Sequence, residues 1–297
     1  METYAAFTDS RNLLSEPERL RARLHEEGYL FLSGLVAGDA VRQTYQEILA
    51  ICQAQGWADR QARPLGSPRL EGSPEWFDVY DPLQRLESFH TLAHHPALLA
   101  LAETVLQEPV LVHPRNIARI TFPGADHFTT PPHQDFVHIQ GTRETYTAWI
   151  PLCDCPVPVG GLAILAGSHR VGLLPVHPAS GPGGVGVNTD GLGLPWLAQD
   201  MAPGDCLFFH SHTIHRALPN VSEDRLRISV DFRYQGFSQP IVEDSLLPHY
   251  GRLTWDAIYQ DWRHTELQYY WRRQPLTVVP RQTLSPVTAA ERQTGNG

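Results

Sequence analysis

The sequence of 297 residues contains no lysine, so all 23 of its basic residues are arginines. This absence excludes pyridoxal-type and aldolase-type Schiff bases, GK[ST] phosphate-binding loops and protein-kinase active sites, because each of these depends on a lysine amine. Guanidinium groups bind anions, but they do not act as proton-transfer bases near neutral pH. An enzyme with this sequence must take its reactivity from other groups.

Cysteines and long hydrophobic runs are also scarce. No stretch approaches 18 apolar residues, and the N-terminus shows no signal-peptide pattern, so we expect no membrane span and a cytoplasmic location. The net charge of −9 argues against a general nucleic-acid-binding protein. The four cysteines lack the spacing of a zinc finger, and we interpret them as reduced thiols: Cys52, Cys153, Cys155 and Cys206.

The hydrophobic content of 42% indicates a globular protein, and we expect one domain over residues 1–280 followed by a polar tail, 281–297. Apolar periodicity predicts helices within 16–107, and short apolar runs between proline and glycine predict an antiparallel barrel or sandwich over about 109–236. An aromatic stripe predicts a C-terminal helix over 254–273. The fold class is therefore mostly β with flanking helices.

One segment, residues 172–200, is rich in glycine and proline and is too long for a plain connection. Segments of this kind often close over a binding site, so we interpret it as a candidate lid.

The strongest local pattern is His133-Gln134-Asp135. On a strand, residues two apart point to the same face, so His133 and Asp135 would present an imidazole and a carboxylate side by side. A two-histidine, one-carboxylate metal triad needs that pair and a further histidine. In a sequence with 15 histidines such a pair also arises by chance, so it is weak evidence alone.

Three histidines follow a strand-like run further along the chain and could supply the third ligand. They are His210, His212 and His215. Alternation along the segment does not separate them.

Taken together, four segments resemble the phytanoyl-CoA dioxygenase (PhyH)-like family of Fe(II)/2-oxoglutarate-dependent oxygenases. They are the H-x-D at 133–135, a G-x-L segment ending in Gly-Ser-His at 160–169, the G-D-x-x-x-F-H-x-x-x-x-H segment with its asparagine at 204–220, and an arginine leading a strand at 225–234. The resemblance covers about residues 20–240. It implies a double-stranded β-helix (jelly roll, cupin-like) core, with Fe(II), 2-oxoglutarate and O2 as cofactors and cosubstrates.

Carried over position by position, the resemblance implies that His133, Asp135 and His215 bind the iron, whereas His210 is the earlier, non-ligating histidine of its segment. It also implies an arginine for the distal carboxylate of 2-oxoglutarate. The R-x-x-I-S pattern selects Arg225, but the spacing from Asn220 is one residue short of the usual one, so Arg227 stays an alternative.

Ala217 is a departure from the family pattern, since many members have serine there. We expect Thr121 as a replacement for the missing hydrogen bond to 2-oxoglutarate.

The resemblance implies hydroxylation, or another oxidation, of an unactivated C–H bond in a small molecule, with decarboxylation of 2-oxoglutarate to succinate. The retained Asp135 favours this over halogenation. We expect an anionic substrate because arginines fall in the part of the family pocket that faces substrate; the candidate substrate residues are Arg115, Arg119, His138, Ile139 and Trp149.

Two other functions stay open. A metal-dependent jelly-roll hydrolase or isomerase would leave the anchoring arginine without a role, and a non-catalytic small-molecule-binding protein would not need all three ligands.

Overall fold

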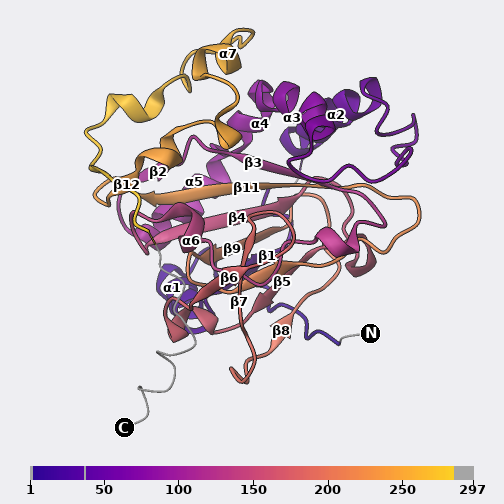
Figure 1. Cartoon of the computed structure of the whole chain (residues 1–297). Coiled ribbons are helices and arrows are strands. Elements are labelled where there is room, and N and C mark those ends of the chain that lie inside the picture. The colour runs from indigo at the N-terminus through magenta and orange to yellow at the C-terminus, as the bar shows by residue number, and fades with distance from the viewer. Residues whose placement is uncertain (1–2, 37, 284–297) are drawn as a thin grey trace.

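The computed structural model describes residues 3–36 and 38–283, which form a mostly β protein with helices around it (Figure 1). The helices are α1 (Pro17–Glu27), α2 (Asp39–Ala54), α3 (Phe77–Gln84), α4 (Glu87–Leu92), α5 (Pro96–Leu106), α6 (Phe136–Ile139) and α7 (Trp255–Tyr259). No helix of the described part is both long and apolar enough to cross a bilayer.

Two antiparallel sheets form the centre of the fold. The larger has the order β1 (Tyr29–Leu32), β9 (Cys206–His210), β4 (Thr145–Pro151), β11 (Arg227–Gly236) and β2 (Val110–Val112), with β3 (Ile117–Thr121) also paired to β11. The smaller has the order β10 (His215–Ala217), β5 (Leu162–Leu165) and β8 (Trp196–Leu197). The expected strands at 109–236 are therefore present.

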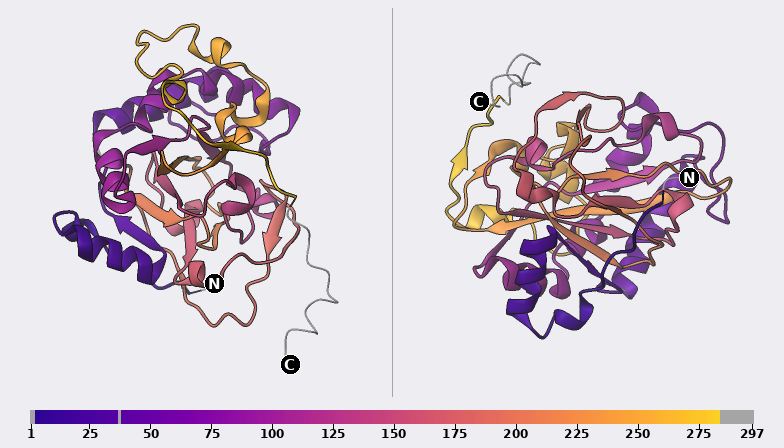
Figure 2. Two further views of the ribbon diagram at one scale, coloured as in Figure 1. Left: turned by 90° about the vertical axis from the view of Figure 1, so that its left-hand side faces the viewer. Right: turned by 90° about the horizontal axis from the view of Figure 1, so that it is seen from below.

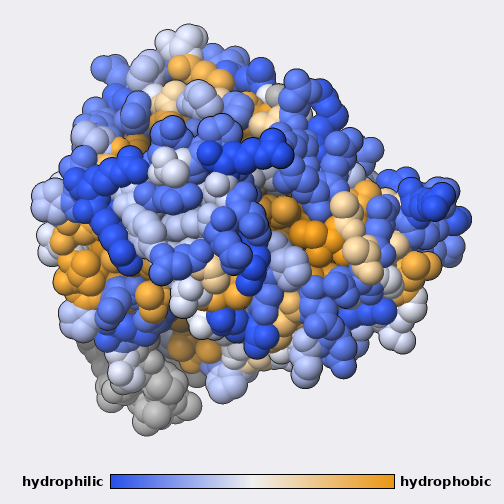
Figure 3. All heavy atoms as spheres, turned by 90° about the horizontal axis from the view of Figure 1, so that it is seen from above, coloured by the Kyte–Doolittle hydropathy of each residue, from blue (hydrophilic) through white to orange (hydrophobic). Residues whose placement is uncertain are grey.

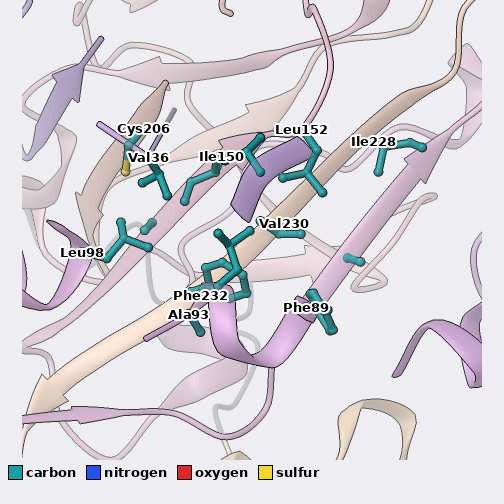
Figure 4. Close-up of a cluster of buried hydrophobic side chains, with 14 of the residues drawn as sticks. Val36, Phe89, Ala93, Leu98, Ile150, Leu152, Cys206, Ile228, Val230 and Phe232 are labelled. Atoms are coloured by element: carbon teal, nitrogen blue, oxygen red, sulfur yellow. The ribbon is translucent and has the colours of Figure 1, made fainter. Parts of the chain in front are cut away.

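The long strand β11 shows how the two faces of the larger sheet differ. Its residues Ile228, Val230 and Phe232 pack against the helices in the main hydrophobic core (Figure 4). The alternate residues are polar or charged yet buried, and they are Arg227, Ser229, Asp231, Arg233 and Gln235. Because side chains alternate along a strand, this polar row points to the opposite face, toward the smaller sheet.

The helices of the N-terminal half lie outside the β core (Figure 2). Helix α1 begins with a proline and ends at Gly28, whose φ of 78° is left-handed and whose amide donates to Leu24. A side chain at Gly28 would also collide with His169, because a Cβ atom would lie 2.3 Å from its Nδ1. Seen from above, hydrophilic residues cover most of the surface (Figure 3).

The C-terminal region differs from the prediction of one helix over 254–273. Helix α7 ends at Tyr259, and only a short 3-10 turn, η8 (Tyr270–Arg273), follows. The amides of Arg263 and His264 donate to the carboxylate of Glu87, so they do not form helical hydrogen bonds. The aromatic residues still pack together as a small core, including Trp255, Tyr259 and Trp271.

The first residues of the expected polar tail, 281–297, contact the rest of the fold. Strands β12 (Ile241–Val242) and β13 (Val278–Val279) pair in parallel, and the next residues bind the fold. Arg281 donates to the carbonyl of His138 at 2.6 Å, and the amide of Gln282 donates to Gln140 at 2.7 Å. Residues 284–297 lie outside the described part.

Segment 172–200 contains a hairpin of β6 (Val176–Pro178) and β7 (Val185–Val187), followed by β8. The amide of Val187 donates to the carbonyl of Pro132 at 2.8 Å, so the hairpin is attached next to the H-x-D pattern.

Candidate metal centre and adjoining cavities

Within the described residues, His133, Asp135 and His215 form a group whose potential ligand atoms all lie within 4.8 Å of one another. All three side chains are buried. His133 and His215 are brought together by a two-hydrogen-bond bridge between their backbones, of 3.0 and 3.1 Å. The ligand set predicted from the sequence therefore converges in space.

The local geometry of the pair 133–135 differs from the strand that we expected. His133 belongs only to the isolated bridge, and at Asp135 the backbone turns to φ −58° and ψ −29° and begins α6. The two side chains meet because the chain turns between them, not because they alternate along a strand.

Hydrogen bonds define which nitrogen of each histidine faces the centre. Nδ1 of His133 lies 2.9 Å from the carbonyl oxygen of Pro131, and Nδ1 of His215 lies 3.0 Å from that of Thr213. Each Nδ1 therefore donates its proton, so Nε2 is the nitrogen that the neutral form of each ring would offer to a metal. These Nε2 atoms lie 3.6 and 3.8 Å from Oδ1 of Asp135.

The protonation states suit a divalent metal. Burial acts to raise the pKa of Asp135, but the positive charge of Arg233 and the interaction with His133 hold it well below its usual value. Burial lowers the pKa of His215 to about 3. An ionised carboxylate and neutral imidazoles are the forms that bind metal, and two histidines with one carboxylate form the donor set of non-haem Fe(II) sites.

Two residues that the sequence analysis missed hold the ligands in place. The hydroxyl of Thr147, on β4, donates to Oδ2 of Asp135 at 2.5 Å. Gln134, fully buried between the two ligands, donates to the carbonyls of Gly172 and His212 and accepts from the amide of Leu174, each at 2.8 Å. Outer hydrogen bonds of this kind orient metal ligands.

The competing histidines lie outside the group. His210, on β9, has Nε2 3.9 Å from a carboxylate oxygen of Glu144, and its Nδ1 accepts from the amide of His212. The ring of His212 packs edge-on against Phe136.

Behind the three ligands, a narrow cavity lies between the two sheets. Trp149 and Ala217 line it, as does Arg227. Arg227 is buried; it donates to the carbonyl of Gly160 at 2.7 Å and to Oγ1 of Thr121 at 2.6 Å, while its Nε has no partner among the described residues. Thr121 thus contacts the arginine and is not among the residues that line the cavity.

Arg225, selected by the family pattern, lies elsewhere. It is exposed, it precedes β11, and it lines a shallow surface depression with Tyr45 and Cys153. The chain between Asn220 and β11 forms a loop that the Asn220 amide closes by donating to the carbonyl of Arg225 at 2.8 Å. Arg225 lies outside the sheet because β11 begins only at Arg227.

On the other side of the ligands, a second cavity of about 210 Å³ opens toward solvent. Its walls include four of the five predicted substrate residues, Arg115, Arg119, His138 and Ile139, whereas Trp149 lines the narrow cavity. His133 and Asp135 border both cavities. Pro182 and Gly183, at the tip of the β6–β7 hairpin, form part of the wall, so segment 172–200 does reach this opening.

The charge of Arg119 is already compensated in this cavity. Its guanidinium donates to Glu71 at 2.6 and 2.8 Å and to Asp231 at 3.1 Å. Burial would lower the pKa of Arg119, but these two carboxylates raise it well above its usual value.

Arg233 lines both cavities and was missed, although the alternation of charged and apolar residues over 227–234 could have indicated it. Its Nη2 lies 3.5 Å from Oδ1 of Asp135.

Comparisons with known proteins identify relatives of this chain. The chain is 31% identical over 263 residues to the 1-deoxypentalenic acid 11-beta-hydroxylase of Streptomyces arenae, which covers 83% of this chain and 91% of that protein. The same enzyme of Streptomyces exfoliatus is 30% identical over the same lengths.

Solved structures show a related fold. The epimerase SnoN, in complex with Fe3+, alpha ketoglutarate and nogalamycin RO, matches with a TM-score of 0.57 and 22% identity over 93% of this chain and 96% of its own. The carbocyclase SnoK from nogalamycin biosynthesis matches with a TM-score of 0.56 and 20% identity over 84% and 95%.

The family model described as phytanoyl-CoA dioxygenase (PhyH) matches residues 24–229, well over half of the sequence. The predicted enzyme class, a dioxygenase that uses iron and 2-oxoglutarate, is confirmed by this match together with the hydroxylase relatives. The chain belongs to the phytanoyl-CoA dioxygenase family.

Proposed function

We propose that this enzyme hydroxylates an unactivated C–H bond of a small anionic molecule. In the balanced reaction, substrate, O2 and 2-oxoglutarate give hydroxylated product, succinate and CO2. One observation carries the proposal: two imidazole Nε2 atoms and the ionised Asp135 converge between two cavities, one of which contains a buried arginine. The hydroxylase relatives, which act by name on an acid, support it.

His133, Asp135 and His215 would hold Fe(II). Their Nδ1 hydrogen bonds and the Thr147 contact fix the ring and carboxylate orientations before the metal binds. Bound iron with 2-oxoglutarate supplies the oxidation of the C–H bond, which side chains of this sequence cannot perform on their own.

Arg227 is the residue that we assign to the distal carboxylate of 2-oxoglutarate. It is buried in the cavity that adjoins the ligands, and its free Nε offers a further donor. Thr121 and the Gly160 carbonyl orient its guanidinium. Since residue 217 is alanine, our candidate for the hydrogen bond that serine gives in many relatives is Thr130, which also lines the cavity.

The larger cavity is our candidate for the substrate. Its volume of about 210 Å³ is below the range of about 300–1,000 Å³ typical of drug-sized ligands, which favours a small molecule. His138 and Ile139 form the wall directly after the ligand Asp135, and the β6–β7 hairpin covers part of the opening, where it limits the access of water.

We also propose that the facing antiparallel sheets form a double-stranded β-helix core within one domain over about residues 1–280. The position of the three ligands between the sheets supports this architecture.

The direct test is product analysis. Purified protein with Fe(II), 2-oxoglutarate and air should form succinate in the uncoupled reaction, in which ascorbate takes the place of substrate as the reductant. His215→Ala should abolish this while His210→Ala should retain it. A wild-type protein that binds Fe(II) but forms no succinate would contradict the proposal.

A further inference from the structure

Arg233 is a buried cation whose positive charge is only partly compensated by a neighbouring carboxylate. Its side chain is 7% exposed, its Nε has no hydrogen-bond partner among the described residues, and its nearest carboxylate oxygen is that of Asp135, at 3.5 Å. Asp135 is the anionic ligand of the proposed metal centre and already accepts from Thr147. A buried guanidinium without a dedicated carboxylate is costly unless a ligand supplies the anion.

Arg115 brings a second such charge to the same cavity. It is half-buried, its Nε donates to the carbonyl of Leu247 at 3.1 Å, and no ion pair to it is found among the described residues. Burial lowers the pKa of Arg115, and the positive charge of Arg233 lowers it further, against the opposing effect of the Asp244 carboxylate. Two guanidinium groups thus repel each other across a cavity that opens to solvent.

Neutral histidines complete the wall and do not offset this charge. Burial lowers the pKa of His113 to about 4 and that of His249 well below its usual value, and the nearby arginines act in the same direction. Both rings line the cavity. Arg119 does not add to the free charge because Glu71 and Asp231 neutralise it.

This arrangement fits a ligand with one planar anionic group. A guanidinium binds carboxylates in a bidentate manner, and a buried charge-assisted pair is stronger than a neutral hydrogen bond. Because Asp135 offsets part of the charge of Arg233, a singly charged group matches the cavity better than a phosphate dianion.

We propose that Arg233 and Arg115 bind a carboxylate of the substrate in the 210 Å³ cavity, at a position separate from the Arg227 site for 2-oxoglutarate. This inference rests on the proposed function, since it names the substrate class of that site. Arg233 then also sets specificity, because it fixes the distance between the substrate anion and the ligand Asp135.

The test uses protein loaded anaerobically with Fe(II) and saturating 2-oxoglutarate, so that the Arg227 site is filled. Benzoic, cyclohexanecarboxylic and 1-adamantanecarboxylic acids, with their primary amides, serve as probes in calorimetric titrations. We expect at least one acid to bind about 10–100-fold more tightly than its amide, the ratio expected for one hydrogen bond to a charged group.

Three variants test which arginines cause the tighter binding of the acid than of its amide. Arg115→Gln and Arg233→Gln should each bring the acid-to-amide ratio close to one, whereas the exposed Arg225→Gln should leave it unchanged. Arg115 does not contact the metal ligands, so its variant stays informative if Arg233→Gln weakens iron binding. No preference for any acid, or a preference that survives in the Arg115 variant, would overturn the inference.

Failure of the proposed function has a different signature. In that case the visible absorption of an iron–keto acid chelate would be missing from the wild-type sample, whatever the acid preference. If only the inference fails, the absorption is present and the acid preference is absent.

Discussion

Thr147 on β4 and Asp135 at the start of α6 are joined by a hydrogen bond of 2.5 Å between Oγ1 and Oδ2. This bond leaves the other oxygen of Asp135, Oδ1, as the atom nearest to both imidazole Nε2 atoms. One hydroxyl therefore selects which carboxylate oxygen is offered to the metal.

Thr147→Val should weaken Fe(II) binding by about 10–100-fold, the range found when an outer hydrogen bond to a metal ligand is removed. The dissociation constant can be measured by competition with a chromogenic chelator. Thr145→Val is the matched control, since Thr145 is also buried on β4 but donates to the carbonyl of Thr142. Equal effects of both variants would mean that the loss is structural.

The choice of His215 over its neighbours can be tested by metal content. His215→Ala should lose stoichiometric iron and reduce turnover at least 100-fold, because its Nε2 is one of the three converging donor atoms. His210→Ala should keep the iron. Loss of iron from the His210 variant, with retention in the His215 variant, would contradict the assignment.

Arg227→Gln should raise the KM for 2-oxoglutarate about 10–100-fold, since one charge-assisted hydrogen bond contributes about 1.5–3 kcal/mol. Arg225→Gln should leave KM unchanged, because Arg225 is exposed outside the cavity. Steady-state succinate formation at varied 2-oxoglutarate compares the two. The reverse order of effects would restore Arg225 as the anchor.

Buried histidines should make stability depend on pH. His90 is fully buried, and burial lowers its pKa to about 4, below the unfolded value of 6.5. Below pH 6.5 the unfolded state therefore binds a proton that the native state does not, and the free energy of unfolding falls as pH is lowered from about 6.5 to about 4.

Urea titrations of the chelator-treated protein across this range measure the slope. His90→Gln should reduce the dependence by about 1.4 kcal/mol for each unit of pKa difference removed. An unchanged slope in the variant would show that the pKa of His90 does not differ between the folded and unfolded states.

Much of the β core and of the candidate metal site could be predicted because the sequence patterns that indicate them are local. Apolar and turn residues alternate over 109–236, and the strands formed there. The candidate ligands His133, Asp135 and His215 came from the family resemblance, and they converge. The charged face of β11, with Asp231 and Arg233, carries a local signal too, because its apolar partners Ile228 and Val230 alternate with it.

The remaining features depend on contacts between distant segments. The chain unwinds after Tyr259 because Glu87, far away in sequence, binds the amides of Arg263 and His264. Arg281 reaches the larger cavity from the expected tail through hydrogen bonds to α6. No pattern near these residues carries that information. The choice of anchoring arginine was ambiguous for a related reason, since the start of β11 determines that Arg227 is buried and Arg225 is exposed.

The most direct test of the central claim, that the converging ligands and Arg227 form one site for iron and 2-oxoglutarate, is an anaerobic titration followed by visible absorption. We predict an iron–keto acid charge-transfer band that requires both Fe(II) and 2-oxoglutarate, disappears in His215→Ala and needs more 2-oxoglutarate in Arg227→Gln. A wild-type protein that binds Fe(II) but shows no band at saturating 2-oxoglutarate would contradict the account.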